Sequence, residues 1–314
     1  MNRVALGIGA AAALAFSATA PAQEKTIRFM YQLSLFGAPQ FIAIKKGWYE
    51  EELKKVGYKV EYSSTMGGNP ILEAMAAGKV DYGELGTSVA VTGIGRGVPL
   101  KIVMTTNIGG ESIVVPASSK IKSISELKGL KVGIQGKGTM QDFILRKALN
   151  DNNIPVSQVE IVEIPAAQLA GTLERGQVDA ATLWEPVASN LVVSGKGRVL
   201  AYGQKIWPDH DNQSPSATDK AIKEHPQAVR VLVRQTVRGL HYCVENATEC
   251  KQAVAERLNL PIEVIDYAWS VTTRPKDGRP NGASLEEFAR KLQEWGMIKR
   301  KLAVKDLVDT QFLN

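Results

Sequence analysis

The chain contains the stretch GKVDYGELGTSVA at residues 78–90 and repeats its pattern as GQVDAATLWEPVA at residues 176–188. Six positions are identical at a constant spacing of 98 residues. In each copy we expect a helix to end at the glycine, a short buried strand to begin at Val-Asp, and a second helix to follow. Six identities are also compatible with a chance match, but the matching order of the surrounding elements favours a duplicated unit. The identical pairs are Gly78 and Gly176, Val80 and Val178, Asp81 and Asp179, Leu85 and Leu183, Val89 and Val187, and Ala90 and Ala188.

The same series of predicted elements precedes and surrounds each copy. The predicted strands are 27–32, 58–63, 130–135 and 159–164, and the predicted helices that follow the first strands are 39–46 and 140–150. Strands that alternate with helices predict parallel sheets joined by right-handed crossovers. The sequence therefore predicts an α/β fold of two Rossmann-like lobes, joined by a two-strand hinge where the chain crosses at 103–113 and 199–205.

The remainder of the chain, from Thr218 onward, has a helical pattern. We expect these late helices to pack back onto the first lobe, the last of them beginning with a capping box at Ser284. The predicted helices are 221–244, 248–258, 262–271 and 285–295. The predicted division of the chain is 23–105 together with 205–314 as lobe I, and 106–204 as lobe II.

The first residues have the layout of a secretory signal peptide. A basic start at Arg3 precedes an apolar run over 4–16, and the small residues of 20–22 predict cleavage after Ala22. A transmembrane anchor is the alternative, but the run is shorter than the roughly 20 apolar residues that span a bilayer. No cysteine stands at the cleavage point, so we expect residues 1–22 to be removed and the mature chain to be periplasmic without a lipid anchor.

Export to an oxidising compartment makes the two cysteines informative. Cys243 and Cys250 are close in the sequence, and we expect them to form a local disulfide, with two partly buried thiols as the alternative. Both are far in the sequence from the loops that are expected to form a binding site. A catalytic role for either thiol is therefore not expected.

Composition and charge exclude several classes of protein. The chain has 314 residues and a net charge of +6 that is spread along it, which predicts no nucleic-acid partner. Two cysteines are too few for a disulfide framework or a cysteine-based zinc module, and the three histidines lack metal-ligand spacing. There is no G-x-S-x-G elbow and no phosphate-binding loop. The sequence predicts no cofactor, no metal and no enzyme activity.

A binding site is expected where loops leave the carboxyl ends of the strands. Several of these loops enter helices, whose free N–H groups and positive dipole ends would converge into an anion site. Lys137 is the only cation in these loops, and its side chain is expected to be solvated. The five loops are 32–39, 64–70, 86–89, 135–140 and 184–186. The candidate binding residues are Gln32, Phe36, Gly68, Asn69, Gly86, Thr87, Ser88, Gly138, Thr139, Met140, Trp184 and Glu185.

Two candidates have alternative interpretations. Trp184 can cover the apolar body of a ligand or close against the opposite lobe, and alternatively it can belong to the core of its own lobe. Glu185 can pair with an ammonium group of a ligand or cap the helix that follows, and capping is favoured. Each of the other candidates can also be an ordinary helix cap or turn residue, so the prediction rests on their joint placement.

Taken together, these motifs resemble the periplasmic solute-binding proteins of ABC importers for nitrate, sulfonates and taurine, a family that also includes binders of thiamine precursors. The resemblance is carried by residues 38–49, 73–87, 124–130, 138–139, 176–180 and 184–186. It implies the type II periplasmic binding fold, two lobes that close around a small anionic solute, and docking of a monomer on a membrane permease and its ATPase.

The resemblance leaves the solute open. Tyr31-Gln32 and Trp184-Glu185-Pro186 look most like the aliphatic sulfonate and taurine binders. Nitrate, an aromatic carboxylate and a thiamine-type pyrimidine are the alternatives. A periplasmic sensor and a sulfinate desulfinase-like enzyme are alternatives of a different class, although the cleft cysteine of the desulfinase is missing here.

Overall fold

Residues 24–313 are described by a computed structural model, so the predicted signal peptide at residues 1–22 lies outside the described residues. The first sheet has the strand order β2-β1-β3-β11-β4, and β5 pairs with β11 beside β4. Its strands are β1 (Lys25–Gln32), β2 (Tyr58–Thr65), β3 (Tyr82–Gly86), β4 (Leu100–Ile102), β5 (Asn107–Ile108) and β11 (Asp211–Thr218). Strand β3 is the first repeat strand, and it lies in the centre of this sheet.

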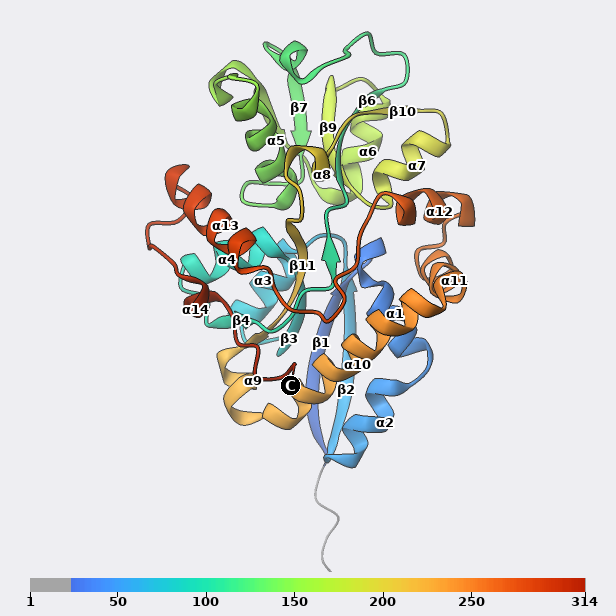
Figure 1. Cartoon of the computed structure of the whole chain (residues 1–314), viewed down its shortest axis with the longest axis vertical. Coiled ribbons are helices and arrows are strands. Elements are labelled where there is room, and N and C mark those ends of the chain that lie inside the picture. Colours follow the sequence, from blue (N-terminus) through green and yellow to red (C-terminus); the bar gives the residue numbers. More distant parts are fainter. Residues whose placement is uncertain (1–23, 314) are drawn as a thin grey trace, which may run out of the picture.

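The second sheet repeats this arrangement with the order β10-β6-β9-β7-β8. Its strands are β6 (Glu111–Pro116), β7 (Lys131–Ile134), β8 (Glu160–Glu163), β9 (Ala180–Trp184) and β10 (Gly197–Tyr202). The repeat strands β3 and β9 each lie between a parallel strand and an antiparallel one. Figure 1 shows the two sheets in two lobes, one above the other. The predicted α/β fold with two lobes is confirmed.

The repeated aspartates explain why the two copies fold alike. Asp81 accepts a hydrogen bond from the backbone N–H of Arg28 at 2.9 Å, and Asp179 accepts one from the backbone N–H of Lys131 at 2.8 Å. In return, the N–H of each aspartate donates to the carbonyl of the same partner residue. Each aspartate thus fastens the start of the central strand to the neighbouring parallel strand. The duplication therefore extends to the contacts that set strand register.

Helices cover both sheets, and most begin where the sequence predicts. Those between the strands are α1 (Ala38–Lys45), α2 (Trp48–Lys55), α3 (Asn69–Ala76), α4 (Thr87–Gly95), α5 (Met140–Asp151), α6 (Ala166–Glu174), α7 (Val187–Val193) and α8 (Gly203–Ile206). Those at the C-terminal end are α9 (Asp219–Glu224), α10 (Pro226–Glu245), α11 (Ala247–Leu258), α12 (Ile262–Ser270), α13 (Gly282–Glu294) and α14 (Val304–Leu307). Short 3-10 turns are η1 (Leu35–Gly37), η2 (Ile124–Leu127) and η3 (Val156–Gln158).

Two details of the predicted C-terminal helices were wrong. The single helix expected over 221–244 is two helices, because Pro226 has no backbone N–H to donate and disfavours helical geometry at His225. The expected cap at Ser284 is instead Asn281, whose side chain accepts hydrogen bonds from the N–H groups of Ala283 and Ser284. The Ser284 hydroxyl accepts a hydrogen bond from the N–H of Asp211.

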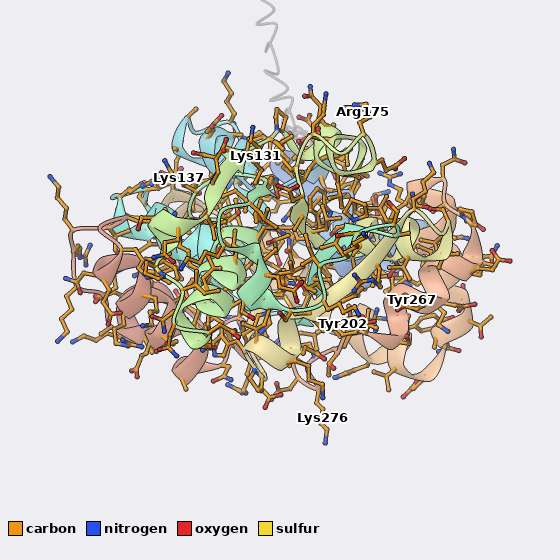
Figure 2. All side chains as sticks on the ribbon, turned by 90° about the horizontal axis from the view of Figure 1, so that it is seen from above. Lys131, Lys137, Arg175, Tyr202, Tyr267 and Lys276 are labelled. Carbon is orange, nitrogen blue, oxygen red and sulfur yellow. A yellow bond between two sulfur atoms is a disulfide. The ribbon has the colours of Figure 1, made fainter. Side chains whose placement is uncertain are left out.

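The late helices do not all pack on the first lobe. Helices α10 and α11 pack against α1, and α13 packs against α4, as expected. Helix α12, however, packs against α7 of the second lobe (Figure 1). On the same side, the hydroxyl of Tyr202 on β10 lies 2.8 Å from that of Tyr267 on α12 (Figure 2). The C-terminal helices therefore bridge the lobes as well as covering one of them.

The crossings between the lobes are shorter than the sequence predicts. Because β5 pairs with β11, the first sheet continues to Ile108, beyond the expected boundary at residue 105. Because α8 packs against β6 and β10, the second lobe continues to Ile206. We therefore propose 24–108 with 211–313 as lobe I and 111–206 as lobe II.

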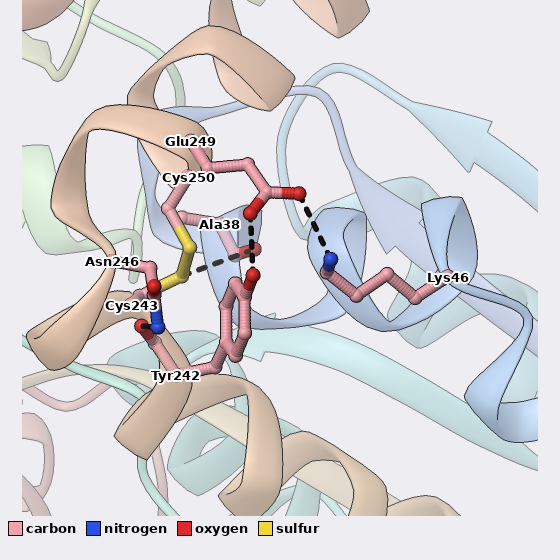
Figure 3. Close-up of a disulfide and its surroundings, with 7 residues drawn as sticks. All are labelled: Ala38, Lys46, Tyr242, Cys243, Asn246, Glu249 and Cys250. Atoms are coloured by element: carbon pink, nitrogen blue, oxygen red, sulfur yellow. Dashed lines mark hydrogen bonds and ion pairs between the residues drawn. A yellow bond between two sulfur atoms is a disulfide. The ribbon is translucent and has the colours of Figure 1, made fainter.

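A disulfide joins Cys243, in α10, to Cys250, in α11. Around it, the hydroxyl of Tyr242 donates a hydrogen bond to the carboxylate of Glu249, which also forms an ion pair of 2.9 Å with Lys46 (Figure 3). This group fastens the corner between α10 and α11 to the end of α1. It lies in lobe I, away from the loops at the sheet ends.

In residues 24–313, no helix has the length and apolar character needed to cross a membrane.

Candidate functional site

A cavity lies between the lobes, where loops at the carboxyl ends of both sheets meet. The space inside it that the centre of a water-sized molecule can occupy is about 20 Å³, enough for about one water molecule, so the lobes lie close together over the cavity in this structure. Each of the five predicted loops contributes at least one residue to its wall. The lining residues are Gln32, Phe36, Gly68, Gly86, Val89, Gln135, Thr139, Met140, Gln141, Trp184, Asn212 and Gln213.

Two lining residues, Asn212 and Gln213, come from a strand that the sequence analysis did not identify. All eight residues of β11 are buried, yet its sequence DNQSPSAT has no apolar alternation. Asn212 is held in place because its amide donates hydrogen bonds to the carbonyl of Gly109 at 2.6 Å and to Glu111 at 2.5 Å. A polar strand inside a sheet leaves no hydrophobic signal, so the burial of β11 was not predictable from periodicity.

The wall of the cavity combines carboxamides with aromatic and aliphatic side chains. Five of the twelve lining side chains are amides, and none of the twelve is Lys, Arg or His. The amide nitrogen of Gln213 is buried and has no hydrogen-bond partner within the described structure. Helices α3, α4 and α5 begin beside the cavity, so their N-terminal dipoles add partial positive charge. The site can therefore hold a small polar or anionic group through neutral donors.

Three of the predicted residues lie behind the wall instead of in it. The hydroxyl of Thr87 lies 2.7 Å from that of Ser214, so it is used within the lobe. The hydroxyl of Ser88 is buried and has no partner in the described part of the chain. Glu185 accepts hydrogen bonds from the N–H of Ser189, at 3.2 Å, and from its hydroxyl, which is the capping role that the sequence favoured.

Two lining residues also have structural roles. Thr139 caps α5, because its hydroxyl accepts from the N–H of Asp142 at 3.4 Å and donates to the carbonyl of Gly136 at 2.7 Å. Trp184 is 4% exposed and lines the cavity at the end of β9. Next to it, the carbonyl of Glu185 accepts a hydrogen bond from the N–H of Leu35 in the other lobe at 3.2 Å. The lobes are therefore in direct contact at this edge of the cavity.

A second hollow opens outside the cavity and contains the remaining candidates. Its empty volume is about 490 Å³, and Asn69 and Gly138 line it from opposite lobes. Lys137, Arg96 and Glu73 also line it, so its walls carry two cations and one carboxylate. The Lys137 ammonium lies 3.4 Å from Glu163, an exposed ion pair. This hollow shares Val89 with the inner cavity.

Buried carboxyl groups surround the inner cavity. Burial raises the pKa of Glu84 to about 8, although a hydrogen bond from the backbone N–H of Gln32 at 3.2 Å acts in the opposite direction. Burial also raises the pKa of Glu185 to about 7, against the hydrogen bonds from Ser189. Both groups are therefore mostly protonated in mildly acidic solution. In such conditions neither of these two groups adds a full negative charge beside the cavity.

The two-lobe α/β architecture, with a cavity between its sheets, is the periplasmic binding protein fold. Residues 21–259 match the NMT1-like family, and the chain belongs to that family.

A protein of Bacillus subtilis (strain 168), provisionally named an aliphatic sulfonates-binding protein, is 28% identical over 93% of this chain and 88% of its own length. The taurine-binding periplasmic protein of Escherichia coli (strain K12) is 25% identical over 72% of this chain and 68% of its own length. The alkanesulfonate-binding protein of Xanthomonas axonopodis pv. citri, solved with bound MOPS, has a TM-score of 0.81 at 20% identity. The match covers 92% of this chain and 99% of that one. These relatives are binding proteins, and the structural likeness agrees with the fold.

Proposed function

We propose that the mature chain is the periplasmic solute-binding component of an ABC importer and captures a small organic anion of the aliphatic sulfonate or taurine class. The observation that carries this proposal is the cavity itself, in which amides and helix N-termini from both lobes face one small volume. The protein acts as a monomer and delivers its solute to a membrane permease. The names of the relatives described above support the sulfonate and taurine class, although a nitrate import protein is also among the relatives.

The lining matches such a solute in two ways. A sulfonate oxygen accepts several hydrogen bonds, and the amides together with the N–H groups at the starts of α4 and α5 are donors. Phe36, Val89, Met140 and Trp184 offer apolar contact to a short carbon chain. An anion held by dipoles avoids the large desolvation cost of a buried ion pair, which allows release to a permease.

A binding screen tests this proposal. Residues 23–314 are purified, unfolded and refolded to remove co-purified solute, and then titrated calorimetrically with ethanesulfonate, taurine, nitrate, phthalate and a hydroxymethylpyrimidine. We expect a sulfonate to bind most tightly and to raise the melting temperature by several degrees. Tighter binding of nitrate, phthalate or the pyrimidine than of both sulfonates would overturn the sulfonate class.

Matched variants test whether the solute binds in the inner cavity. Gln141→Met and Gln213→Met keep side-chain volume but remove an amide, and we expect each to weaken sulfonate binding about tenfold. The same substitution at the exposed Gln168 of α6 is the control and should leave the affinity unchanged. Unchanged affinity in both cavity variants would show that the solute binds elsewhere.

We also propose that the chain is not an enzyme. Its two cysteines are joined to one another in lobe I, so neither supplies a thiol to the cavity. A desulfinase with a cleft thiol would need such a group. Incubation with an alkanesulfinate should therefore release no sulfite, and sulfite release above the buffer rate would contradict this proposal.

A further inference from the structure

An aromatic cluster joins the lobes, and none of its four residues lines the cavity. Phe143, on α5 of lobe II, lies with its ring centroid 4.7 Å from Trp207, 4.7 Å from Phe288 and 4.9 Å from Trp295. Trp207 belongs to the crossing between the lobes, Phe288 lies in α13 of lobe I, and Trp295 follows directly after that helix. Phe143 is 1% exposed, so this contact is fully buried at its centre. We call these four residues the aromatic latch.

The aromatic latch is connected to the cavity through helix α5. Phe143 lies in the first turn of α5, the helix that brings Thr139, Met140 and Gln141 into the cavity wall. Any shift of α5 relative to α13 must therefore move that wall.

A series of polar contacts also connects the loop at the cavity to the opposite lobe. The carboxylate of Asp142 accepts a hydrogen bond from the N–H of Gly138 at 3.0 Å, in the loop before α5. It also accepts one from Nε of Arg146 at 2.6 Å. The guanidinium of Arg146 lies over the ring of Trp295, 5.7 Å from its centroid. The loop at the cavity is thus linked through α5 to the opposite lobe.

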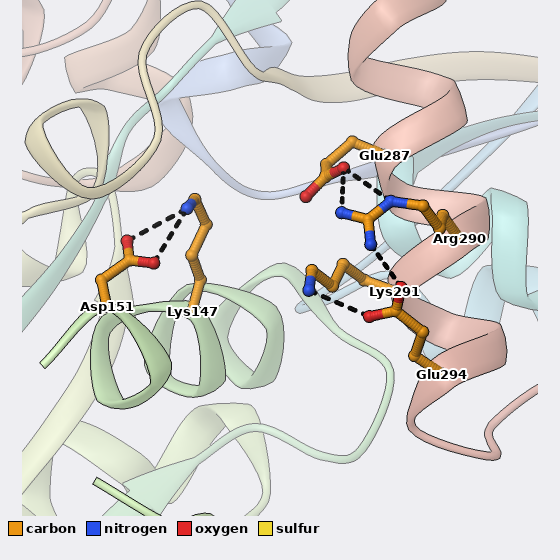
Figure 4. A network of polar contacts seen from close by, with 6 residues as sticks. All are labelled: Lys147, Asp151, Glu287, Arg290, Lys291 and Glu294. Carbon is orange, nitrogen blue, oxygen red and sulfur yellow. Dashed lines mark hydrogen bonds and ion pairs between the residues drawn. The ribbon is translucent and has the colours of Figure 1, made fainter. Parts of the chain in front are cut away.

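Apart from the Arg146 guanidinium over the Trp295 ring, the charged groups on the two facing helices pair within their own helix. On α5, Lys147 pairs with Asp151 at 3.0 Å, and on α13 Lys291 pairs with Glu294 at 2.9 Å. Arg290 also pairs within α13, so the ion pairs drawn in Figure 4 run within each helix. The contact between α5 and α13 therefore depends on aromatic packing, which salt does not screen.

We propose that the aromatic latch sets the affinity of the protein for its solute without touching it, by stabilising the arrangement in which the lobes are closed. The apparent dissociation constant is the intrinsic one divided by the fraction of molecules already closed. A weaker latch lowers that fraction and must weaken every solute by the same factor. This effect on affinity rests on the proposed solute capture, whereas the effect on shape does not.

Small-angle X-ray scattering of the solute-free chain tests the effect on shape. We expect Trp207→Ala and Trp295→Ala to increase the radius of gyration equally at low and high salt, and Trp295→Phe to restore it. Trp48→Ala is the control, because Trp48 is 7% exposed and packs on Tyr242 within lobe I. An unchanged radius in both latch variants, or an equal increase in the control, would overturn the proposal. If Trp295→Ala does not fold, Trp295→Leu replaces it.

Calorimetry then tests the effect on affinity with ethanesulfonate and taurine. We expect the latch variants to weaken both by one common factor of about ten, or 1.4 kcal/mol. Factors that differ between the two solutes would mean that the variants alter contacts with the solute, and would overturn the proposal. If neither sulfonate binds the parent protein, the proposed function fails while the scattering result still decides the latch.

Discussion

At the scale of single residues, the glycines near the cavity illustrate what the sequence could and could not predict. Gly67 and Gly68 lie in the predicted loop 64–70, and adjacent glycines allow another group to approach the backbone closely. The structure shows that the approaching group at Gly67 is a side chain of the other lobe, because a Cβ there would lie 1.6 Å from the amide nitrogen of Gln135. The need for space was predictable from the residue type. Its occupant was not, because it depends on how the lobes meet.

The buried carboxyl of Glu84 predicts a pH dependence of stability. Its pKa is raised from 4.5 to about 8 in the folded protein, mainly by burial. Between these values the folded state holds a proton that the unfolded state has released, so stability falls as pH rises. The loss is about 1.4 kcal/mol per pH unit at most. Glu84→Gln cannot lose a proton, and we expect its stability to fall less between pH 5 and pH 8.

Urea unfolding of the parent and the variant across this pH range measures the difference. Other raised carboxyls, such as Glu185 and Asp211, contribute equally to both proteins, so the difference between the two curves isolates Glu84. Parallel curves would show that Glu84 is ionised throughout and that the cavity carries a buried negative charge.

At the scale of secondary structure elements, periodicity predicted the repeated strands and the helices that follow them. Periodicity failed to predict a strand that is buried but polar. Strand β11 is fully buried although six of its eight residues are polar, because its side chains bond to neighbours such as Thr87 and Glu111. It supplies Asn212 and Gln213 to the cavity, so one wall of the candidate site was missing from the sequence-based prediction. A lone sequence gives no sign that such hydrogen-bond partners exist.

The paired aspartates of the repeat predict unequal costs for the same substitution. Asp81 is buried and is bonded by the Arg28 guanidinium as well as by its N–H, whereas Asp179 is exposed. Burial alone raises the pKa of Asp81, but the hydrogen bonds from Arg28 together lower it. We expect Asp81→Asn to cost about 1.5–3 kcal/mol and Asp179→Asn less than 1 kcal/mol. Urea unfolding near neutral pH measures both, and equal costs would refute this ranking.

At the scale of the whole molecule, three of the contacts between the lobes lie around the hinge. The aromatic latch lies on one side, α12 and α7 lie on the other, and Leu35 bonds to Glu185 at the cavity edge. The sequence predicted two lobes and a cleft because both follow from the repeated unit. It did not predict the first two of these bridges, because each depends on a C-terminal helix outside the repeat. The position of one lobe on the other is therefore set largely by residues that the duplication does not include.

Gly110 lies in the crossing between the lobes, and substituting it tests how the contact between the crossing and Phe36 affects the site. Its φ is +109°, and an added Cβ would lie 2.6 Å from the Phe36 ring, which lines the cavity. Gly97 is the matched control, because its φ is +91° but a Cβ there would have no atom within 4 Å. We expect Gly97→Ala to cost about 1–3 kcal/mol of unfolding free energy through backbone strain alone. Gly110→Ala should cost more and should also reduce the melting-temperature rise produced by a bound sulfonate, which Gly97→Ala should retain. Differential scanning fluorimetry with and without the sulfonate measures both effects, and an equal rise in the two variants would show that Phe36 can move without consequence for the site.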